Sequence, residues 1–464
     1  MRRHFYLVIL GLAMAVCQGQ PRLMYTTVVP LADLGQYDIV PELKLGSDGM
    51  FYGAVPHGGA FGHGSLYKTS IDGAITFIPF DGTNGDSPGG LPVEAPDGKF
   101  YGAASEGGSM GGGTVFCLET NGNLKAIYSF DMTNGGNPGG LLMRTNGEMY
   151  GMTVAGGIGY DGTPYSGAGV FFKLTTNGQF TLIANFTETN AYPFGPYEGG
   201  DGNFYGYTGR GGLYQYGTIF RITPDGQIST LVTFDGTNGA YPRRLTRGSD
   251  GAFYGCTGGT NPSIATDTSS KVFRMTTNGD FTILHTFSSG TGVSPFGGLL
   301  EVSNGLFYGT TYIGGLNGPG TVFQLSTNGD YAVLLNFDSR WSKNSYPETG
   351  LAKGPDGNFY GITSQPRREI FCLRPVEAPV FQTTVQNGQI NFNWNAWGGL
   401  SYELLYKTNL NDPFTYFSYL GGTLSDTNIV GTYSQPVDPT APRFYFLRIN
   451  IRENWWGLPP LTGP

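Results

Sequence analysis

The chain of 464 residues is poor in charged side chains, histidine and cysteine. Charged residues make up only 13% of it, with 26 Lys and Arg against 34 Asp and Glu, giving a formal net charge of −8. No cluster of Lys and Arg follows a groove or a helix, which argues against nucleic acid as a partner. Only four histidines are present. His57 and His63 flank one loop, but no cysteine or Glu-x-x-His spacing accompanies them, so a metal site there is not favoured.

Apolar runs long enough for a membrane span are also absent. The run at residues 5–16 is shorter than the ~20 residues that a spanning helix needs. Two arginines precede it and small residues follow at 17–19, a pattern typical of a signal peptide covering residues 1–19. We therefore expect an exported protein, extracellular or periplasmic, with no transmembrane helix in the mature chain. The alternative is a lipoprotein signal at Cys17, which would tether the protein to a membrane.

Three cysteines remain after such a cleavage, namely Cys117, Cys256 and Cys372. An odd count leaves at least one thiol outside any disulfide. Cys117 and Cys372 occupy the same position of two non-adjacent repeats, where their Cα atoms should lie farther apart than the ~7 Å that a disulfide allows. The sequence thus predicts buried, unpaired thiols.

Glycine is abundant, with 77 residues, and it recurs in a pattern. Seven times the tripeptide Phe-Tyr-Gly, or a near copy, follows an Asx-Gly turn. A period of about 50 residues falls in the range of β-propellers. The seven tyrosines are Tyr52, Tyr101, Tyr150, Tyr205, Tyr254, Tyr308 and Tyr360.

Each repeat predicts four strands, as the sixth repeat illustrates. Its apolar runs at 295–302, 306–311, 321–326 and 331–337 are separated by turns and a glycine-rich loop, and Asn-Gly pairs mark two hairpins. Adjacent Phe and Tyr on one strand point to opposite faces of the sheet, so both should be core. The glycine that follows them is expected to let neighbouring sheets approach closely.

The strand count favours a closed ring. Repeats one to six each end in a fourth strand, whereas the seventh stops after Leu373, and a spare strand lies before the first repeat at 23–31. Pairing that strand onto the last blade would remove an exposed edge. The predicted fold class is all-β: a seven-bladed β-propeller over residues 20–375, closed by the N-terminal strand. A small β-sandwich of the fibronectin type III kind and a tail are expected over 376–464. The protein is expected to be a monomer.

The sequence contains one segment that matches a catalytic motif and one repeated pattern that could bind a metal ion. Gly-x-Ser-x-Gly at 107–111 matches a nucleophile elbow, but it lies in a loop between strands instead of a strand-to-helix turn. The loops between blades repeat an Asp with an Asn three residues later, whose oxygens could hold Ca²⁺ or simply form Asx turns. The turn is the favoured interpretation, and no other cofactor is expected. These residues are Asp81, Asn84, Asp131, Asn134, Asp235 and Asn238.

The same interblade loops and the loops between second and third strands should emerge on one face of the disc. Aromatic rings among glycines and amides on that face suit the stacking of sugar rings, and exposed tyrosines also serve protein interfaces. The candidate ligand-binding residues are Phe61, His63, Tyr160, Tyr165, Tyr214 and Tyr216.

The pattern Asp-Gly-x-Phe-Tyr-Gly … Gly-Gly … Gly-Thr-Val-Phe-x-Leu-Thr-Thr-Asn-Gly resembles the GloVer tandem-repeat family of bacterial exported proteins. The resemblance covers residues 24–374 and is best in the second, fourth and sixth repeats. Motifs near Tyr402 and Arg443 resemble small C-terminal modules of secreted bacterial proteins. The resemblance implies fold and export, and no activity comes with it.

Three functions fit these observations. The first is a secreted, non-enzymatic binding or scaffold protein that recognises carbohydrate or protein through the propeller loops. The second is an extracellular propeller enzyme acting on polysaccharide, whose paired carboxylates would converge only in space. The third is a structural cell-surface protein.

Overall fold

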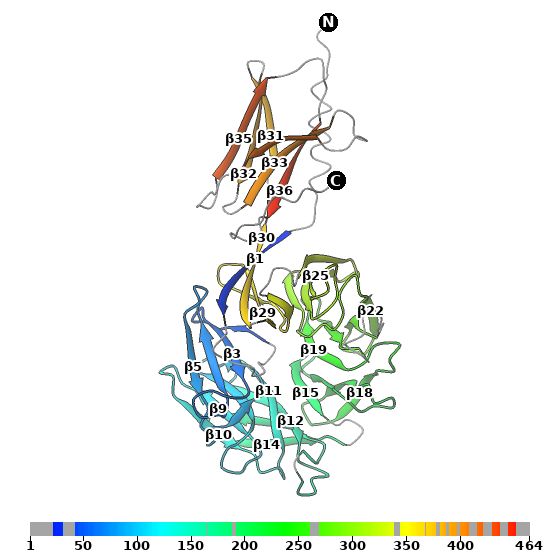
Figure 1. The fold of residues 1–464 in the computed structure, drawn as a ribbon. Helices are drawn as coiled ribbons and strands as arrows, with labels where there is room; N and C mark the ends of the chain where they lie inside the picture. The colour runs from blue at the N-terminus through cyan, green and yellow to red at the C-terminus, as the bar shows by residue number, and fades with distance from the viewer. Residues whose placement is uncertain are drawn as a thin grey trace. The chain divides into compact units, whose positions relative to one another are not determined.

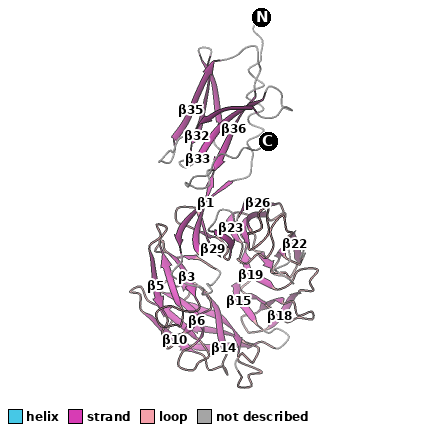
Figure 2. Ribbon diagram, in the orientation of Figure 1, coloured by secondary structure: helices cyan, strands magenta, loops and turns pink. Residues whose placement is uncertain are grey.

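The computed structural model describes residues 22–30, 42–163, 165–187, 192–259, 269–337, 344–366 and 368–376, together with six strands of the C-terminal region. Every regular element in this described part of the chain is a β-strand, as Figure 2 shows. None of its elements is a helix long and apolar enough to cross a membrane. The chain divides into two compact units: residues 25–374 form one, and residues 375–464 with 1–24 form the other.

Seven sheets make up the unit 25–374, and they follow one another in chain order around a ring (Figure 1). The strands of the first three blades are β2 (Lys44–Leu45), β3 (Phe51–Val55), β4 (Ser65–Thr69) and β5 (Ile75–Pro79); β6 (Asp86–Pro88), β7 (Val93–Glu94), β8 (Phe100–Glu106), β9 (Thr114–Leu118) and β10 (Leu124–Ser129); and β11 (Gly136–Met143), β12 (Glu148–Ala155), β13 (Val170–Thr175) and β14 (Phe180–Asn185).

Each of the next three blades is a sheet of four antiparallel strands. They comprise β15 (Pro193–Glu198), β16 (Phe204–Thr208), β17 (Thr218–Ile222) and β18 (Ile228–Thr233); β19 (Pro242–Arg247), β20 (Phe253–Thr257), β21 (Lys271–Met275) and β22 (Phe281–Thr286); and β23 (Leu300–Ser303), β24 (Leu306–Thr311), β25 (Thr321–Ser326) and β26 (Tyr331–Asn336).

The seventh blade contains β27 (Asn344–Pro347), β28 (Ala352–Lys353), β29 (Phe359–Pro366) and β30 (Glu369–Val376). Its sheet order is β1-β30-β29-β27, so the outermost strand is β1 (Arg22–Pro30), from the opposite end of the sequence. The Tyr25 ring stacks on Phe371 of β30 at 5.5 Å between centroids.

The first strand of each blade lies toward the axis of the ring, because first strands of neighbouring blades contact one another: β7 with β11, β11 with β15, β15 with β19, and β2 with β28. These inner strands are irregular. In the sixth repeat β23 begins only at Leu300, five residues after the start expected from the sequence. Pro295 has no N–H to donate to a neighbouring strand, which explains part of the difference. In the fifth blade the register of β19 on β20 likewise shifts between Pro242 and Leu245.

The Asp-Gly turn and the tyrosine four residues later are joined by a hydrogen bond. In the fourth blade the Tyr205 hydroxyl donates to Asp201 Oδ2 at 2.8 Å, while Asp201 Oδ1 accepts the backbone N–H of Asn203. Burial and the Asp201 carboxylate raise the pKa of Tyr205, so the hydroxyl remains a donor. The equivalent Tyr–Asp bond recurs in the first, second, fifth and seventh blades.

Phe and Tyr of the repeat form the contacts between blades, which confirms that they are core. Their side chains are buried in all seven repeats, with methionine in place of phenylalanine in the third. The tyrosine of one blade packs on the phenylalanine of the next at six of the seven junctions, including Tyr360 on Phe51 between the last blade and the first. Aromatic pairs of this kind add about 0.5–1.5 kcal/mol each beyond their buried area.

The glycine after each tyrosine has a different role from the one expected. Gly206 of β16 pairs directly with Phe220 of β17, and the Phe220 ring covers the space where a side chain would be. The same arrangement, an aromatic ring from the third strand over the glycine, recurs in every blade. The close approach is therefore within one sheet, and the expectation of close approach between neighbouring sheets was wrong.

Gly206→Ala should destabilise the propeller by about 1–3 kcal/mol, the usual cost of overpacking. A Cβ at this position would lie 2.5 Å from Phe220 Cζ and 2.6 Å from the carbonyl oxygen of Phe194. Gly140→Ala is the matched control, because a Cβ there would meet no atom within 4 Å. Thermal unfolding of both variants checks the prediction, and equal melting temperatures would contradict it.

The cysteines and the C-terminal unit complete the fold. Cys117, Cys256 and Cys372 are all buried, and Cys117 and Cys256 are free thiols as predicted. Burial raises the pKa of Cys256 to about 12.

The C-terminal strands form two three-stranded antiparallel sheets, β31-β32-β35 and β34-β33-β36. Their bounds are β31 (Phe381–Gln386), β32 (Gln389–Ala396), β33 (Leu400–Lys407), β34 (Thr415–Leu420), β35 (Ile429–Pro436) and β36 (Phe444–Ile451).

Candidate functional site

Two sets of loops emerge on one face of the ring, which we call the loop face. One set joins the second and third strands of a blade, and the other, the interblade loops, leads from a fourth strand into the next blade. Antiparallel strands place both sets opposite the Asx-Gly turns. Backbone hydrogen bonds join the two sets: Gly108 donates to Gly82 at 2.8 Å, and Gly157 donates to Met132 at 2.9 Å.

Exposed large apolar side chains gather on the loop face. Of twelve such side chains in the described residues, three lie on the outer strands β5, β14 and β22. Nine of the twelve therefore lie on one face, which makes that face the first candidate for an interaction surface. The nine on the loop face are Phe61, Met110, Ile158, Tyr165, Tyr192, Phe194, Leu213, Tyr214 and Leu316.

The aromatic residues predicted from the sequence lie on this face but not in one place. Phe61, Tyr165 and Tyr214 are exposed by 62%, 54% and 53%. Tyr160 and Tyr216 are half-buried. They belong to loops of the first, third and fourth blades, so the structure distributes them around the ring.

The sixth predicted residue, His63, belongs to a polar cluster. Its Nδ1 lies 2.6 Å from Asp86 Oδ2, and the Ser87 hydroxyl donates to Asp86 Oδ1 at 3.1 Å. The same hydroxyl is 3.4 Å from His57 Nδ1. Because each histidine contacts a different partner, neither imidazole lies between hydroxyl and carboxylate as in a hydrolytic triad. Within the described ranges, no group of three or more His, Cys, Asp or Glu is placed to hold a metal ion.

The interblade Asp and Asn residues form local turns. Asp81 Oδ1 accepts the backbone N–H groups of Thr83 and Asn84, and Asn84 Oδ1 accepts the N–H of Asp81. The Asn84 N–H is the largest cause that lowers the pKa of Asp81. The Asp–Asn exchange recurs at Asp131 with Asn134 and at Asp235 with Asn238. Calcium binding by these loops stays a prediction.

The Gly-x-Ser-x-Gly segment is part of the loop face. Ser109 is exposed in a turn between β8 and β9, and no helix follows it. A nucleophile elbow depends on a strand-to-helix turn to expose and orient its serine. This segment therefore has the geometry of a glycine-rich loop.

In six blades, a proline lies in the segment that leads from the interblade loop into the first strand. The residue before this proline is not glycine, yet its backbone has the positive φ of the left-handed conformation. The φ angles of these residues lie between 53° and 64°, and each is followed directly by proline. Proline disfavours a helical conformation in the residue before it, and such strained positions cluster at functional sites. The six are Ser87, Asn137, Tyr192, Tyr241, Ser294 and Tyr346.

A second group of aromatic residues lies on or next to the first and second strands of the fourth, sixth and seventh blades. Phe194 stacks on Tyr207 at 5.3 Å between ring centroids. Tyr312 contacts both Phe296, at 5.1 Å, and Tyr346, at 5.3 Å. With the charged residues described next they form what we call the axial cluster. Its members are Glu42, Phe194, Tyr207, Arg243, Arg244, Phe296, Tyr312 and Tyr346.

Two adjacent arginines of β19 have different partners. Arg244 Nη1 forms an ion pair with Glu42, which precedes β2 in the first blade, so this contact links two non-adjacent blades. The Arg243 guanidinium lies over the Phe296 ring, 4.3 Å from its centroid. Its Nε is buried and has no hydrogen-bond partner among the described residues.

The charges near the axis influence one another. Burial raises the pKa of Tyr207, and the two arginines partly oppose this shift. Burial lowers the pKa of Arg243 and of Lys44, although Glu42 opposes it at Lys44. These directions place the tyrosine, both arginines, the lysine and the glutamate in one electrostatic environment.

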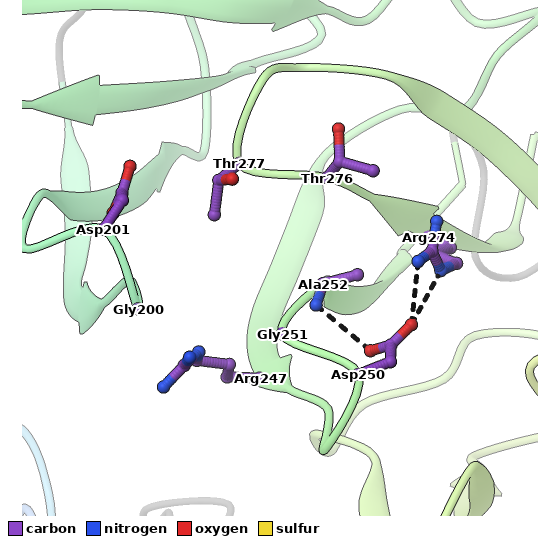
Figure 3. Close-up of a pocket in the computed structure, with 9 residues that line it drawn as sticks. All are labelled: Gly200, Asp201, Arg247, Asp250, Gly251, Ala252, Arg274, Thr276 and Thr277. Carbon is purple, nitrogen blue, oxygen red and sulfur yellow. Dashed lines mark hydrogen bonds and ion pairs between the residues drawn. The ribbon is translucent and has the colours of Figure 1, made fainter.

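A cavity of about 330 Å³ lies on the opposite face, among the turns of the fourth and fifth blades (Figure 3). Figure 3 shows Asp250 bonded to Arg274 and to the backbone N–H of Ala252. Asp250 and Asp201 also accept the tyrosine hydroxyls of their own repeats. Because these carboxylates serve the turn motif found in most blades, the cavity follows from the repeat, whereas the axial cluster is specific to a few blades.

The sequence reasoning missed the axial cluster, although a signal for it was present. After the inner proline the second and third repeats read Gly-Gly-Leu, the sixth reads Phe-Gly-Gly-Leu, and the fifth reads Arg-Arg-Leu. Aligning the repeats at this segment would have singled out Arg243, Arg244 and Phe296.

Comparison with solved structures shows a propeller fold. Puromycin hydrolase is 13% identical with a TM-score of 0.51, and the match covers 82% of this chain and 62% of that one. The extracellular domain of a proposed hybrid two-component system from B. thetaiotaomicron is 10% identical with a TM-score of 0.50. This match covers 92% of this chain and 57% of that one. The chain thus spans about 60% of these proteins' length, and the likeness carries the fold alone.

Comparison of sequences gives the family. No curated protein matches the chain. The model of the Gloeobacter/Verrucomicrobia repeat matches residues 25–166 and 160–369, which together cover well over half of the sequence. The buried Phe-Tyr-Gly strands and Asx-Gly turns described above all lie within this range. The chain therefore belongs to the Gloeobacter/Verrucomicrobia repeat family.

Proposed function

We propose that this propeller is a non-enzymatic binding protein that recognises carbohydrate on its loop face, next to the axial cluster. The observation that supports this most is the set of aromatic rings that remain accessible there. Phe194, with 39% of its surface exposed, is already stacked on Tyr207. Sugar rings stack their apolar C–H faces on such aromatics and form hydrogen bonds at their rims.

Some of these rings are held in place before any ligand binds. The Tyr165 hydroxyl donates to Glu106 of the neighbouring blade at 2.7 Å. The Tyr216 ring packs edge-on against Tyr241, 5.7 Å away. A side chain that is already ordered loses less conformational entropy when a ligand binds. This preorganisation favours recognition by the loop face.

Phe194→Ala and Tyr214→Ala should each weaken glycan binding by about 1–2 kcal/mol, the usual contribution of an accessible aromatic anchor. Phe77→Ala is the matched control, because Phe77 has the same 39% exposure as Phe194 but lies on the outer strand β5. A glycan array finds the ligand and calorimetry measures the affinities. Binding that survives both loop-face substitutions would refute the proposal, and a protein partner captured by the same face would replace the carbohydrate.

The enzymatic alternative needs two carboxylates facing one substrate. Near the axis Glu42 is paired with Arg244, and Glu348 accepts from Arg368 Nε at 3.3 Å. Carboxylates engaged in this way are suited to positioning arginines, so we favour binding over hydrolysis.

Several further features of the chain belong to this proposal. We propose export through a signal peptide at residues 1–19, a monomeric protein, and a ring closed by β1. The two C-terminal sheets would pack as a β-sandwich of the fibronectin type III kind, acting as a spacer or a second recognition module. The proposal includes no cofactor: the Asx turn remains the favoured interpretation of the interblade loops, with calcium binding as its alternative.

A further inference from the structure

Arg243 is the strongest candidate for a ligand-binding cation in the propeller. The corresponding positions of sister repeats are mostly glycine: Gly89-Gly90 in the second and Gly139-Gly140 in the third. The fifth repeat has Arg243-Arg244 instead. Two arginines in place of glycine on an inner strand add charge close to the axis, and only Arg244 has an acidic partner there among the described residues.

The surroundings provide space for both arginines. A Cβ on Gly258 would lie 2.8 Å from Arg243 Nε, and a Cβ on Gly298 would lie 2.8 Å from Arg244 Cδ. Both arginine side chains thus depend on a glycine of their own or the next blade. The sequence therefore has a glycine at each position where a larger side chain would collide with one of the two arginines.

The two arginines differ in what they leave available. Arg244 is neutralised by Glu42. Arg243 has no acidic partner in the described chain, and Phe296 covers one face of its guanidinium. A guanidinium stacked on an aromatic ring keeps its in-plane N–H donors directed outward, and these match the two oxygens of a carboxylate. The Nε of Arg243 is buried against the backbone at Gly258 and has no partner among the described residues, so this guanidinium is not fully hydrogen-bonded within the protein.

The charge balance supports an anion at this position. Arg243, Arg244 and Lys44 give three cationic groups against Glu42 and Glu94, an excess of one, in a chain whose net charge is −8. In the seventh blade, the negative charge of Glu348 is balanced by its ion pair with Arg368. An uncompensated positive region near the axis of an acidic protein attracts anionic ligands and raises their rate of association.

We propose that the axial cluster binds an acidic sugar, with Arg243 holding the carboxylate of a uronic acid unit. Phe194, which stacks on Tyr207, and Tyr312, which packs against Phe296, provide rings for the sugar itself. This inference rests on the proposed carbohydrate binding and adds the class of sugar. The carboxylate would form a bidentate pair with the guanidinium, with no bond made or broken.

The test compares oligomers of galacturonate, glucuronate, mannuronate and guluronate with their methyl esters, by calorimetry on the full chain. Esterification removes the charge and preserves the sugar. At least one acid should bind about tenfold or more tightly than its ester, as charged hydrogen bonds typically contribute. In Arg243→Gln this ratio should fall to about twofold or less.

Two further variants exclude trivial explanations. Arg247→Gln removes an exposed arginine from the far end of the same strand, and it should leave the ratio unchanged. Arg243→Lys keeps the charge but loses the planar fork, so it should retain part of the preference. Thermal melts verify that each variant is folded.

The outcomes separate this inference from the proposed function. If acid and ester bind the wild type equally, or if the preference persists in Arg243→Gln, the acidic-sugar inference is wrong while carbohydrate binding stands. If neither form of any oligomer binds, both are wrong. A preference that extends to a sulfated neutral glycan with equal affinity would overturn the assignment of a carboxylate.

Discussion

Tyr205→Ala should lower the stability of the propeller by about 3–5 kcal/mol, the usual cost of removing a large buried aromatic side chain. Tyr205 is fully buried, and its ring packs 4.6 Å from Phe253 of the next blade. Its hydroxyl donates to Asp201 and reaches the Thr277 carbonyl oxygen at 3.1 Å. The substitution therefore removes a contact between blades and one of the hydrogen-bond donors to the turn carboxylate of Asp201.

The melting temperature measures this loss. For a unit the size of residues 25–374, unfolding entropy scales so that this change lowers Tm by about 4–7 °C. Tyr214→Ala in the same blade is the control, because that side chain is exposed and its loss should change Tm by about 1 °C or less. Similar melting of wild type and Tyr205→Ala would show that the blade interfaces do not depend on this ring.

The core could be predicted from the sequence because each residue of the repeat has a local physical reason. The Asp-Gly pair forms a turn, and Phe and Tyr alternate to opposite faces, so burial on both sides follows without knowledge of any partner. The role of Gly206 could not be predicted in this way. It depends on the register that places Gly206 opposite Phe220, and a one-residue shift would have placed it elsewhere.

The candidate site was less accessible to sequence reasoning, for a related reason. Exposed rings such as Tyr214 and Tyr165 were found because they lie in glycine-rich loops, outside the strand pattern. The axial cluster depends on contacts between blades, such as Arg243 over Phe296 and Arg244 with Glu42. Spacing along one repeat carries no information about which residues of different repeats meet near the axis.

Deleting β1, residues 22–30, should reduce stability more than any single substitution proposed above. In the sheet order of the seventh blade β1 is the neighbour of β30, and Tyr25 contacts both Phe371, at 5.5 Å, and Phe337, at 5.9 Å. Without β1 the seventh blade would present β30 as an open edge, which invites aggregation. We expect Tm to fall by more than for Tyr205→Ala, or the protein to become insoluble, as monitored by circular dichroism and light scattering.

A rescue experiment separates loss of the edge strand from general damage to the chain. A synthetic peptide of residues 22–30 should bind the truncated protein by adding a strand to β30, and it should restore much of the lost Tm. A peptide of the same composition in scrambled order should not, because the aromatic contacts of Tyr25 depend on its position in the strand. Deleting residues 452–464 instead should leave the propeller's melting unchanged. If the truncated protein melts like the wild type and remains soluble, the ring does not need β1, and the closure proposed for it is wrong.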